Sequence, residues 1–196
     1  MNSAPPLSSS SIGFKEWANV CEALSSGVMS LILRKGGIHE GRGGFEFKHR
    51  EFFLFPTWFH TQGERLTWTP DQPARFDFPP EEERTSVDID GFATLEKVWR
   101  VTEWEQVAAL APLHVWAEEI VRERFVYDEE SCLNIALVRA CKLPATWHMP
   151  YAKSYGGCRS WITLPEPPTG WREASVPALS DAAFAAIKAK IEAILG

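Results

Sequence analysis

Residues that could contact a ligand are concentrated between Leu31 and His60, where the sequence reads LILRKGGIHEGRGGFEFKHREFFLFPTWFH. Arginine and lysine side chains in this stretch can hold a phosphate, and its seven aromatic side chains can stack on a base. A second candidate stretch, Tyr155 to Trp161, combines a glycine turn with two more rings. We expect a binding site formed by Arg34, Lys35, Arg50, Thr57, Trp58, His60, Arg139, Tyr155, Ser160 and Trp161. The alternative is that Trp58 and Trp161 belong to the core.

The triplet Glu46, Phe47 and Lys48 offers a different chemistry. It fits the E-x-K half of a PD-(D/E)XK nuclease, in which a carboxylate holds a divalent metal ion and the lysine steadies the attacking water. A second carboxylate is required from an upstream strand end, but that strand ends in Arg34 and Lys35. If the protein is a nuclease, Glu46 and Lys48 are its candidate catalytic residues and a divalent metal ion is its expected cofactor. If it is not a nuclease, no cofactor is predicted.

Three histidines, His39, His49 and His60, are spaced by ten and eleven residues. Neutral imidazoles on neighbouring strands can bind zinc. Nothing in the sequence places these three on one face, so no metal site is predicted.

Cys158 is a candidate nucleophile, because it follows Gly156 and Gly157 and precedes Arg159, which could favour the thiolate. No catalytic signature surrounds this cysteine. The favoured alternative is a structural loop that seats Tyr155 and Trp161.

Composition limits the class of protein. The 196 residues, 45% apolar and 23% charged, suffice for one well-cored domain. A net charge of −6 argues against binding of nucleic acid over the whole surface. Residues 34–51, however, hold five basic and three acidic side chains, which leaves one local basic site. Four cysteines without a C-x-x-C pair, no apolar run long enough to span a membrane, and no signal peptide predict a cytoplasmic protein.

The hydrophobic pattern predicts the elements that position these residues. Apolar residues from Phe14 to Leu24 recur at helical spacing, and Gly27 ends that helix. Residues 28–35 form a strand with Arg34 at its end. A second strand, 45–55, buries alternate phenylalanines and is stopped by Pro56.

In the second half of the chain, a long strand from 85 to 101 needs a bulge near Gly91 or Lys97 to keep its apolar residues inward. Thr102 and Glu105 form a capping box for a short helix, and a further helix starts at Pro112. Residues 132–143 form a central strand that ends before Pro144, and residues 160–164 form the last strand. Ser180 caps a closing helix.

Helices and strands do not alternate regularly, so the predicted fold is α+β. It has a mixed, largely antiparallel sheet or partly closed β-barrel, flanked by helices, with a C-terminal helix. We expect a disordered tail over 1–11, a single domain over 12–164, a linker over 165–179 and the closing helix over 180–196. That helix could dock on the domain or on a partner protein.

Several runs carry a resemblance to a known family: LRKGGIHE, FEFKHREFFLFPTWFH, HVWAEEIVRERF, LVRACKLP and YGGCRSW. Together they resemble the bacterial domain-of-unknown-function family 1802 over residues 14–164. The resemblance implies a defence or DNA-processing context, such as restriction-modification, without a named reaction. The strand order is also similar to the small PUA, ASCH and EVE barrels, which implies a PUA-like fold that binds RNA or modified bases.

Three functions follow from these observations. The first is a module that binds DNA, RNA or a nucleotide, with bases that could be modified. The second is the metal-dependent nuclease, and the third is a non-catalytic subunit that binds a protein partner through its C-terminal helix. Whether the protein is an enzyme stays open.

Arg139 lies on a strand that is apolar on both faces. A buried guanidinium must be paired, because an unpaired one costs several kcal/mol. We expect either a carboxylate partner, Glu46 or Glu96, or an opening toward Arg34 and Arg50. In the second case an anionic ligand would supply the missing charge.

Overall fold

The computed structural model describes residues 11–35, 46–58, 61–69, 83–127 and 130–196. One seven-stranded sheet runs in the order β2-β5-β4-β3-β1-β6, and β7 adds to β5. Among the described residues, every pair of neighbouring strands is antiparallel except β1 with β3. The predicted α+β class with a mixed, largely antiparallel sheet, flanking helices and a C-terminal helix is confirmed. Among the described residues, no helix is both long enough and apolar enough to cross a membrane.

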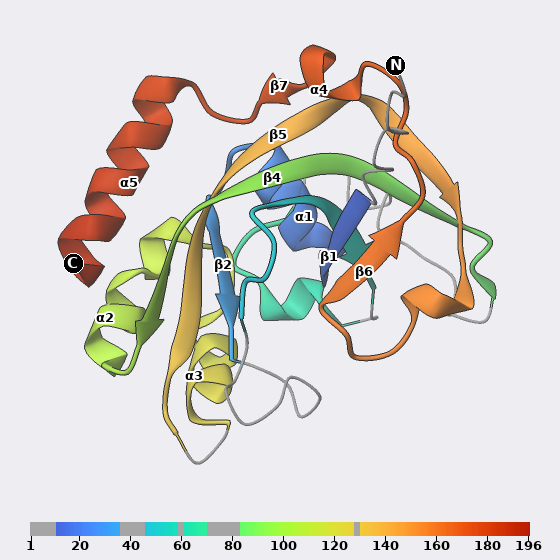
Figure 1. Ribbon diagram of the computed structural model, residues 1–196. Helices are drawn as coiled ribbons and strands as arrows, with labels where there is room; N and C mark the ends of the chain where they lie inside the picture. The colour runs from blue at the N-terminus through green and yellow to red at the C-terminus, as the bar shows by residue number, and fades with distance from the viewer. Residues whose placement is uncertain (1–10, 36–45, 59–60, 70–82, 128–129) are drawn as a thin grey trace, which may run out of the picture.

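Two long strands, β4 (Ser86–Val101) and β5 (Leu133–Pro150), arch across the molecule in Figure 1. The prediction was one bulge, near Gly91 or Lys97; their register shifts at both places, between Ile89 and Gly91 and between Leu95 and Lys97. A Cβ on Gly91 would lie 2.8 Å from Leu54 Cδ1 and 3.0 Å from Ser25 Cβ, so glycine allows the close approach of β4 to these residues. The predicted end of β5 before Pro144 is wrong. The strand continues because proline, which has no N–H to donate, falls where pairing with β4 is interrupted.

The strand β1 (Ser11–Trp17) replaces the first turns of the predicted helix, and only α1 (Ala18–Ser25) is helical. Phe14 satisfies the helical spacing, yet pairing with both β3 and β6 fixes its backbone as a strand. Gly27 follows α1 with φ +78°, as predicted. Helical periodicity therefore gave the right helix but the wrong start.

Four consecutive residues of β3 (Glu51–Thr57), Phe52 to Phe55, are all buried. Their side chains alternate between two apolar clusters. Phe52 and Leu54 belong to one, which we call the first core, and Phe53 and Phe55 belong to the second core. The bounds predicted for this strand, 45–55, are wrong, because residues 46–50 are not in a strand and β3 ends at Thr57. Pro56 lies inside β3, opposite Glu16 of β1.

At one end of the sheet, β2 (Leu31–Arg34) lies on the edge beside β5. The helices α2 (Trp104–Ala109) and α3 (Glu118–Val126) lie near this end in Figure 1. The predicted capping box is wrong: Glu103 is the N-cap of α2, and Thr102 Oγ1 donates to its carboxylate at 3.3 Å. Pro112 lies in a 3₁₀ turn, Ala111–Leu113, rather than at the start of α3. Two other 3₁₀ turns are Gly63–Arg65 and Lys153–Tyr155.

The C-terminal part follows β6 (Trp161–Leu164). The segment predicted as a linker contains α4 (Trp171–Ala174) and β7 (Val176–Pro177). Arg172 binds the Glu51 carboxylate through both terminal nitrogens, at 3.0 and 2.9 Å, which ties α4 to β3 and lowers the pKa of Glu51.

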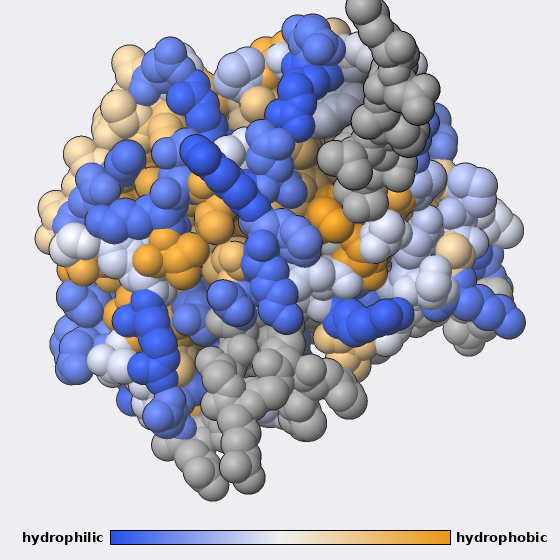
Figure 2. Space-filling view, in the orientation of Figure 1, coloured by the Kyte–Doolittle hydropathy of each residue, from blue (hydrophilic) through white to orange (hydrophobic). Residues whose placement is uncertain are grey.

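The last helix, α5 (Asp181–Leu195), begins at Ser180, whose hydroxyl accepts the Ala183 N–H as predicted. Phe184 and Ile191 bury their side chains in the first core, so α5 docks on the domain along the side shown at the left of Figure 1. Polar and apolar side chains are interspersed over the face shown in Figure 2.

Candidate functional site

A cavity of about 460 Å³ opens where β1 and β3 end. These two strands are parallel neighbours, so their carboxyl ends meet at one edge, with Trp17 opposite Thr57. Arg34 at the end of β2, Arg84 before β4, and the loop between β5 and β6 complete the wall. The described lining residues are Lys15, Glu16, Trp17, Arg34, Phe55, Pro56, Thr57, Trp58, Arg84, Tyr151, Tyr155, Gly156, Gly157, Cys158, Arg159 and Ser160.

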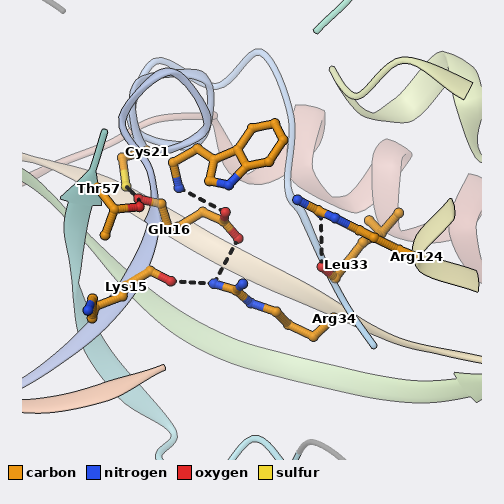
Figure 3. A network of polar contacts seen from close by, with 8 residues as sticks. Lys15, Glu16, Cys21, Leu33, Arg34, Thr57 and Arg124 are labelled. Atoms are coloured by element: carbon orange, nitrogen blue, oxygen red, sulfur yellow. Dashed lines mark hydrogen bonds and ion pairs between the residues drawn. The ribbon is translucent and has the colours of Figure 1, made fainter. Parts of the chain in front are cut away.

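Glu16 lines the cavity and lies at the centre of a polar network, which Figure 3 shows. Its side chain is fully buried, Oε1 accepts the Trp17 N–H at 2.8 Å, and Oε2 lies 3.2 Å from Arg34 Nη2. The same Arg34 nitrogen donates to the Lys15 carbonyl. The Glu16 carbonyl accepts a hydrogen bond from Thr57 Oγ1 at 3.0 Å. Because a buried carboxylate needs its partners, this network fixes Arg34 at the cavity wall.

A second guanidinium lies behind the first. Arg124 of α3 is 4.8 Å from the ring centre of Trp17 and donates to the Leu33 carbonyl at 3.5 Å. Burial lowers its pKa to about 10; the Glu16 charge opposes this shift and the Arg34 charge adds to it. Arg124 is therefore still charged at neutral pH, and the buried Glu16 carboxylate pairs with Arg34 and also stabilises the charge of Arg124.

Lys15 connects β1 to the loop before β6. Its Nζ donates to the carbonyls of Tyr155 and Gly157 at 2.7 and 2.6 Å, and its backbone N–H donates to the Ser160 carbonyl at 2.8 Å. Gly157 has φ +75°, a conformation that favours glycine. These three hydrogen bonds hold the segment from Tyr155 to Ser160 against β1.

The remaining wall combines cations with rings. Arg84 lies 5.1 Å from the ring centre of Trp58, and the Tyr155 ring packs against Phe55 at 5.4 Å. Among the described lining residues, four are basic, Lys15, Arg34, Arg84 and Arg159, and one is acidic, Glu16. Such a site can hold an anion together with a flat aromatic group.

The structure brings together half of the residues predicted to bind a ligand. Arg34, Thr57, Trp58, Tyr155 and Ser160 all line the cavity, and so does the exposed thiol of Cys158. Thr57 uses its hydroxyl hydrogen within the protein, so its role here is to hold β1 to β3.

Other predicted residues lie elsewhere. Lys35 donates to the carbonyls of Phe125 and Glu130, and Arg50 is exposed but does not line this cavity. Trp161 packs its ring 4.7 Å from that of Phe14 and lines an adjoining cavity. His60 lies outside the described residues.

Arg139 has neither of the partners predicted for it. It pairs with Asp181 at the start of α5 and lies 5.3 Å from the ring centre of Phe184. Its side chain is 32% exposed and that of Asp181 is 89% exposed, so the pair lies at the surface. The predicted pairing with Glu46 or Glu96 is wrong, since α5 packs beside this strand and supplies the carboxylate.

The residues of the nuclease hypothesis do not line the cavity. Glu46 and Lys48 are both exposed, and the Glu46 carbonyl accepts the Trp161 indole N–H at 3.4 Å. Within the described ranges, no group of three histidine, cysteine or carboxylate side chains could hold a metal ion. His39 and Glu40 lie outside those ranges.

Sequence reasoning missed Lys15, Glu16, Trp17, Arg84, Tyr151 and Arg159. The first three were hidden because residues 14–24 were interpreted as one helix. A signal was available for two others: Tyr151 lies shortly before the candidate stretch Tyr155 to Trp161, and Arg159 lies within it. Nothing in the local pattern distinguishes Arg84 from a surface charge.

Comparison with known proteins gives a family and a set of similar folds. The crystal structure of ASCH from Zymomonas mobilis is 12% identical, with a TM-score of 0.44, covering 80% of this chain and 89% of that one. A single-residue variant of the same protein is 13% identical, with a TM-score of 0.45 and coverages of 80% and 91%. No curated protein matches the sequence. The model of a domain of unknown function, DUF1802, matches residues 13–190, and the chain therefore belongs to the DUF1802 family.

Proposed function

We propose that the protein is a nucleic-acid-binding module that takes one nucleotide of DNA or RNA, or a free nucleotide, into the cavity at the ends of β1 and β3. The observation that carries this proposal is the gathering of four basic side chains and several rings around one cavity in a chain of net charge −6.

The dimensions and chemistry of the cavity support a nucleotide. Its volume of about 460 Å³ lies within the roughly 300–1,000 Å³ of typical small-molecule sites. Arginine and lysine bind phosphate, and base stacking on an aromatic ring contributes on the order of 1–3 kcal/mol. Lys15 and Arg34 are already held by hydrogen bonds, so binding would order few further side chains.

The resemblance seen in the sequence supports a defence or restriction-modification setting, in which modified bases would be among the ligands. Binding of this kind needs no cofactor. No contact among the described residues favours the nuclease hypothesis over binding.

Fluorescence anisotropy with labelled single-stranded DNA and RNA at low salt tests the proposal, because phosphate attraction is strongest there. Free adenosine and cytidine monophosphates, plain and with methylated bases, serve as competitors. We expect Arg84→Gln to weaken binding about tenfold, since it removes a cation and its contact with Trp58. The matched control is Arg122→Gln on α3, which removes an equivalent cation 4.4 Å from the Trp104 ring centre, away from the cavity.

Absence of binding to every one of these probes at low salt would overturn the proposal. Equal losses from Arg84→Gln and Arg122→Gln would also count against it, because binding would then not depend on this cavity.

A further inference from the structure

We infer that the cavity adjoining the first one is a subsite for a second nucleotide, so that the ligand is a single strand at least two nucleotides long. This inference rests on the proposed function and specifies its ligand.

The second cavity has a volume of about 310 Å³. Its described lining residues are Ile12, His49, Ser154, Tyr155, Arg159, Trp161, Ile162 and Thr163. Tyr155 and Arg159 line both cavities, so the two spaces adjoin at these residues of the loop between β5 and β6, and we call the two residues the shared wall.

The shared wall, Tyr155 and Arg159, supplies a cation for a linking phosphate and an aromatic ring for a base. Arg159 is exposed and is anchored through Nη2 to the Ser154 carbonyl at 3.0 Å. Because Arg159 lines both cavities, its guanidinium can contact the phosphate that joins two nucleotides. Tyr155 also lines both cavities, and its ring is supported by Phe55 and Tyr151.

The wall of the second cavity is aromatic and rigid. Trp161 packs against Phe14 and Phe52, with ring centres 4.7 and 5.3 Å apart, and its indole N–H is bonded to the Glu46 carbonyl. The His49 ring lies at its edge, 5.0 Å from it between ring centres. Rings fixed in this way can take a base with little loss of side-chain freedom.

Two separate cavities favour a single strand over a duplex. A base enters a protein cavity only when it leaves its stack, and neighbouring bases that enter two separate cavities must be splayed apart. In a single strand this separation breaks no base pairs, whereas in a duplex it breaks two.

Competition titrations with three adenine probes test the inference: the mononucleotide pA, the bisphosphate pAp and the dinucleotide pApA, in ribose and deoxyribose forms. The bisphosphate controls for the added phosphate, so the difference between pApA and pAp reports the second base. We expect pApA to bind about tenfold more tightly than pAp.

Two variants locate that gain in the second cavity. His49→Ala removes a ring from its wall, and Thr163→Tyr fills it from an exposed position on β6. Each should bring pApA to within about threefold of pAp while leaving the affinity for pA unchanged. His148→Ala, which removes an exposed histidine that lines neither cavity, should preserve the full gain.

The outcomes separate the two proposals. If pA binds but pApA binds no more tightly than pAp, the second subsite is refuted and the proposed function stands. A gain that survives both His49→Ala and Thr163→Tyr would place the second base outside this cavity and overturn the inference. Failure of all three probes and of longer single strands to bind would refute both proposals together.

Discussion

Glu16 is the residue on which the geometry of the candidate site depends. It is fully buried, and its carboxylate is the one acidic side chain among the described lining residues of the main cavity. Arg34 and Arg124 both lie within its electrostatic reach. The negative charge of Glu16 compensates the positive charge of Arg34 and stabilises that of Arg124, so both guanidiniums can lie near the end of β1.

Replacing Glu16 with glutamine tests this role. The change keeps the size of the side chain but removes the charge that pairs with Arg34 and also acts on Arg124, so we expect the free energy of unfolding to fall by about 3 kcal/mol. Arg34 keeps 21% of its side chain exposed, which places the expected loss at the lower end of the range for buried pairs. Urea denaturation at pH 7 measures it. The control is Glu118→Gln at an exposed position of α3, which should change stability by less than about 0.5 kcal/mol.

His114 predicts a pH dependence of stability. Burial lowers its pKa to about 4, and the positive charge of Arg124 adds to the effect. In the unfolded chain the pKa is about 6.5. Between pH 6.5 and pH 4 the unfolded chain therefore binds a proton that the folded protein does not, so stability falls as the pH falls through this window.

The variant His114→Gln isolates this effect from the titration of carboxylates. Relative to the variant, the wild-type protein should lose on the order of 3 kcal/mol of unfolding free energy between pH 7 and pH 4. Urea denaturation of both proteins at pH 7, 5.5 and 4 gives the comparison. A difference between them that stays constant with pH would contradict the prediction.

At the scale of elements, the C-terminal part is bound to the domain more extensively than a linker and a free helix would be. The short strand β7 pairs with β5, α4 is tied to β3 by Arg172 and Glu51, and α5 contributes Phe184 and Ile191 to the first core. Lys97 and Trp99 of β4 also donate to the carbonyl of Gly196, at 3.2 and 2.8 Å. These contacts leave α5 with its apolar face already occupied.

Truncation after Leu164 should therefore destabilise the remaining domain. Uncovering the sites of Phe184 and Ile191 alone corresponds to a loss of about 3–6 kcal/mol, at roughly 1.5–3 kcal/mol for each buried side chain. Thermal unfolding of the truncated protein, beside full-length Phe184→Ala, measures the loss and its share from one residue. An unchanged unfolding midpoint after truncation would show that α5 contributes little and would leave it available to a partner protein.

The success of sequence reasoning also differed between elements. A bulge in β4 was predictable, because a shift of parity within one long apolar pattern has few other solutions. The pattern did not decide between Gly91 and Lys97, and the register shifts near both. The start of α5 was predictable from an equally local signal, the Ser180 cap. The strand β1 was not predictable from its own residues, because Phe14 and Trp17 fit a helix and only pairing with β3 and β6 decides otherwise.

For the whole molecule, the general position of the site was predictable and its composition was only partly so. Arg34, Trp58 and Tyr155 were found because each lies within two residues of a glycine or proline, residue types that indicate turns and strand ends in a sequence. Glu16 and Lys15 were missed because their importance comes from the parallel pairing of β1 with β3, which joins residues about 40 positions apart. Such long-range pairing leaves no periodic signal in one sequence.

The contrast between an acidic molecule and one basic cavity leads to a prediction about salt. For single strands, the logarithm of the binding constant falls with the logarithm of salt concentration by about 0.7 per phosphate neutralised. Three phosphate contacts from the four basic lining residues would give a slope of about −2. Arg159→Gln should reduce the slope by about 0.7, whereas Arg100→Gln, at an exposed position on β4 outside both cavities, should leave it unchanged.

Duplex DNA should behave differently, because it can use neither cavity without losing base pairs and the molecule as a whole has a net charge of −6. We expect its affinity to be at least about tenfold below that of a single strand of equal length in anisotropy titrations from low to moderate salt. Duplex binding as tight as single-strand binding, with a slope that Arg159→Gln does not change, would mean that contacts outside the cavities dominate. The basic cavity would then have no part in recognition, because the attraction for phosphate would come from residues elsewhere on the surface.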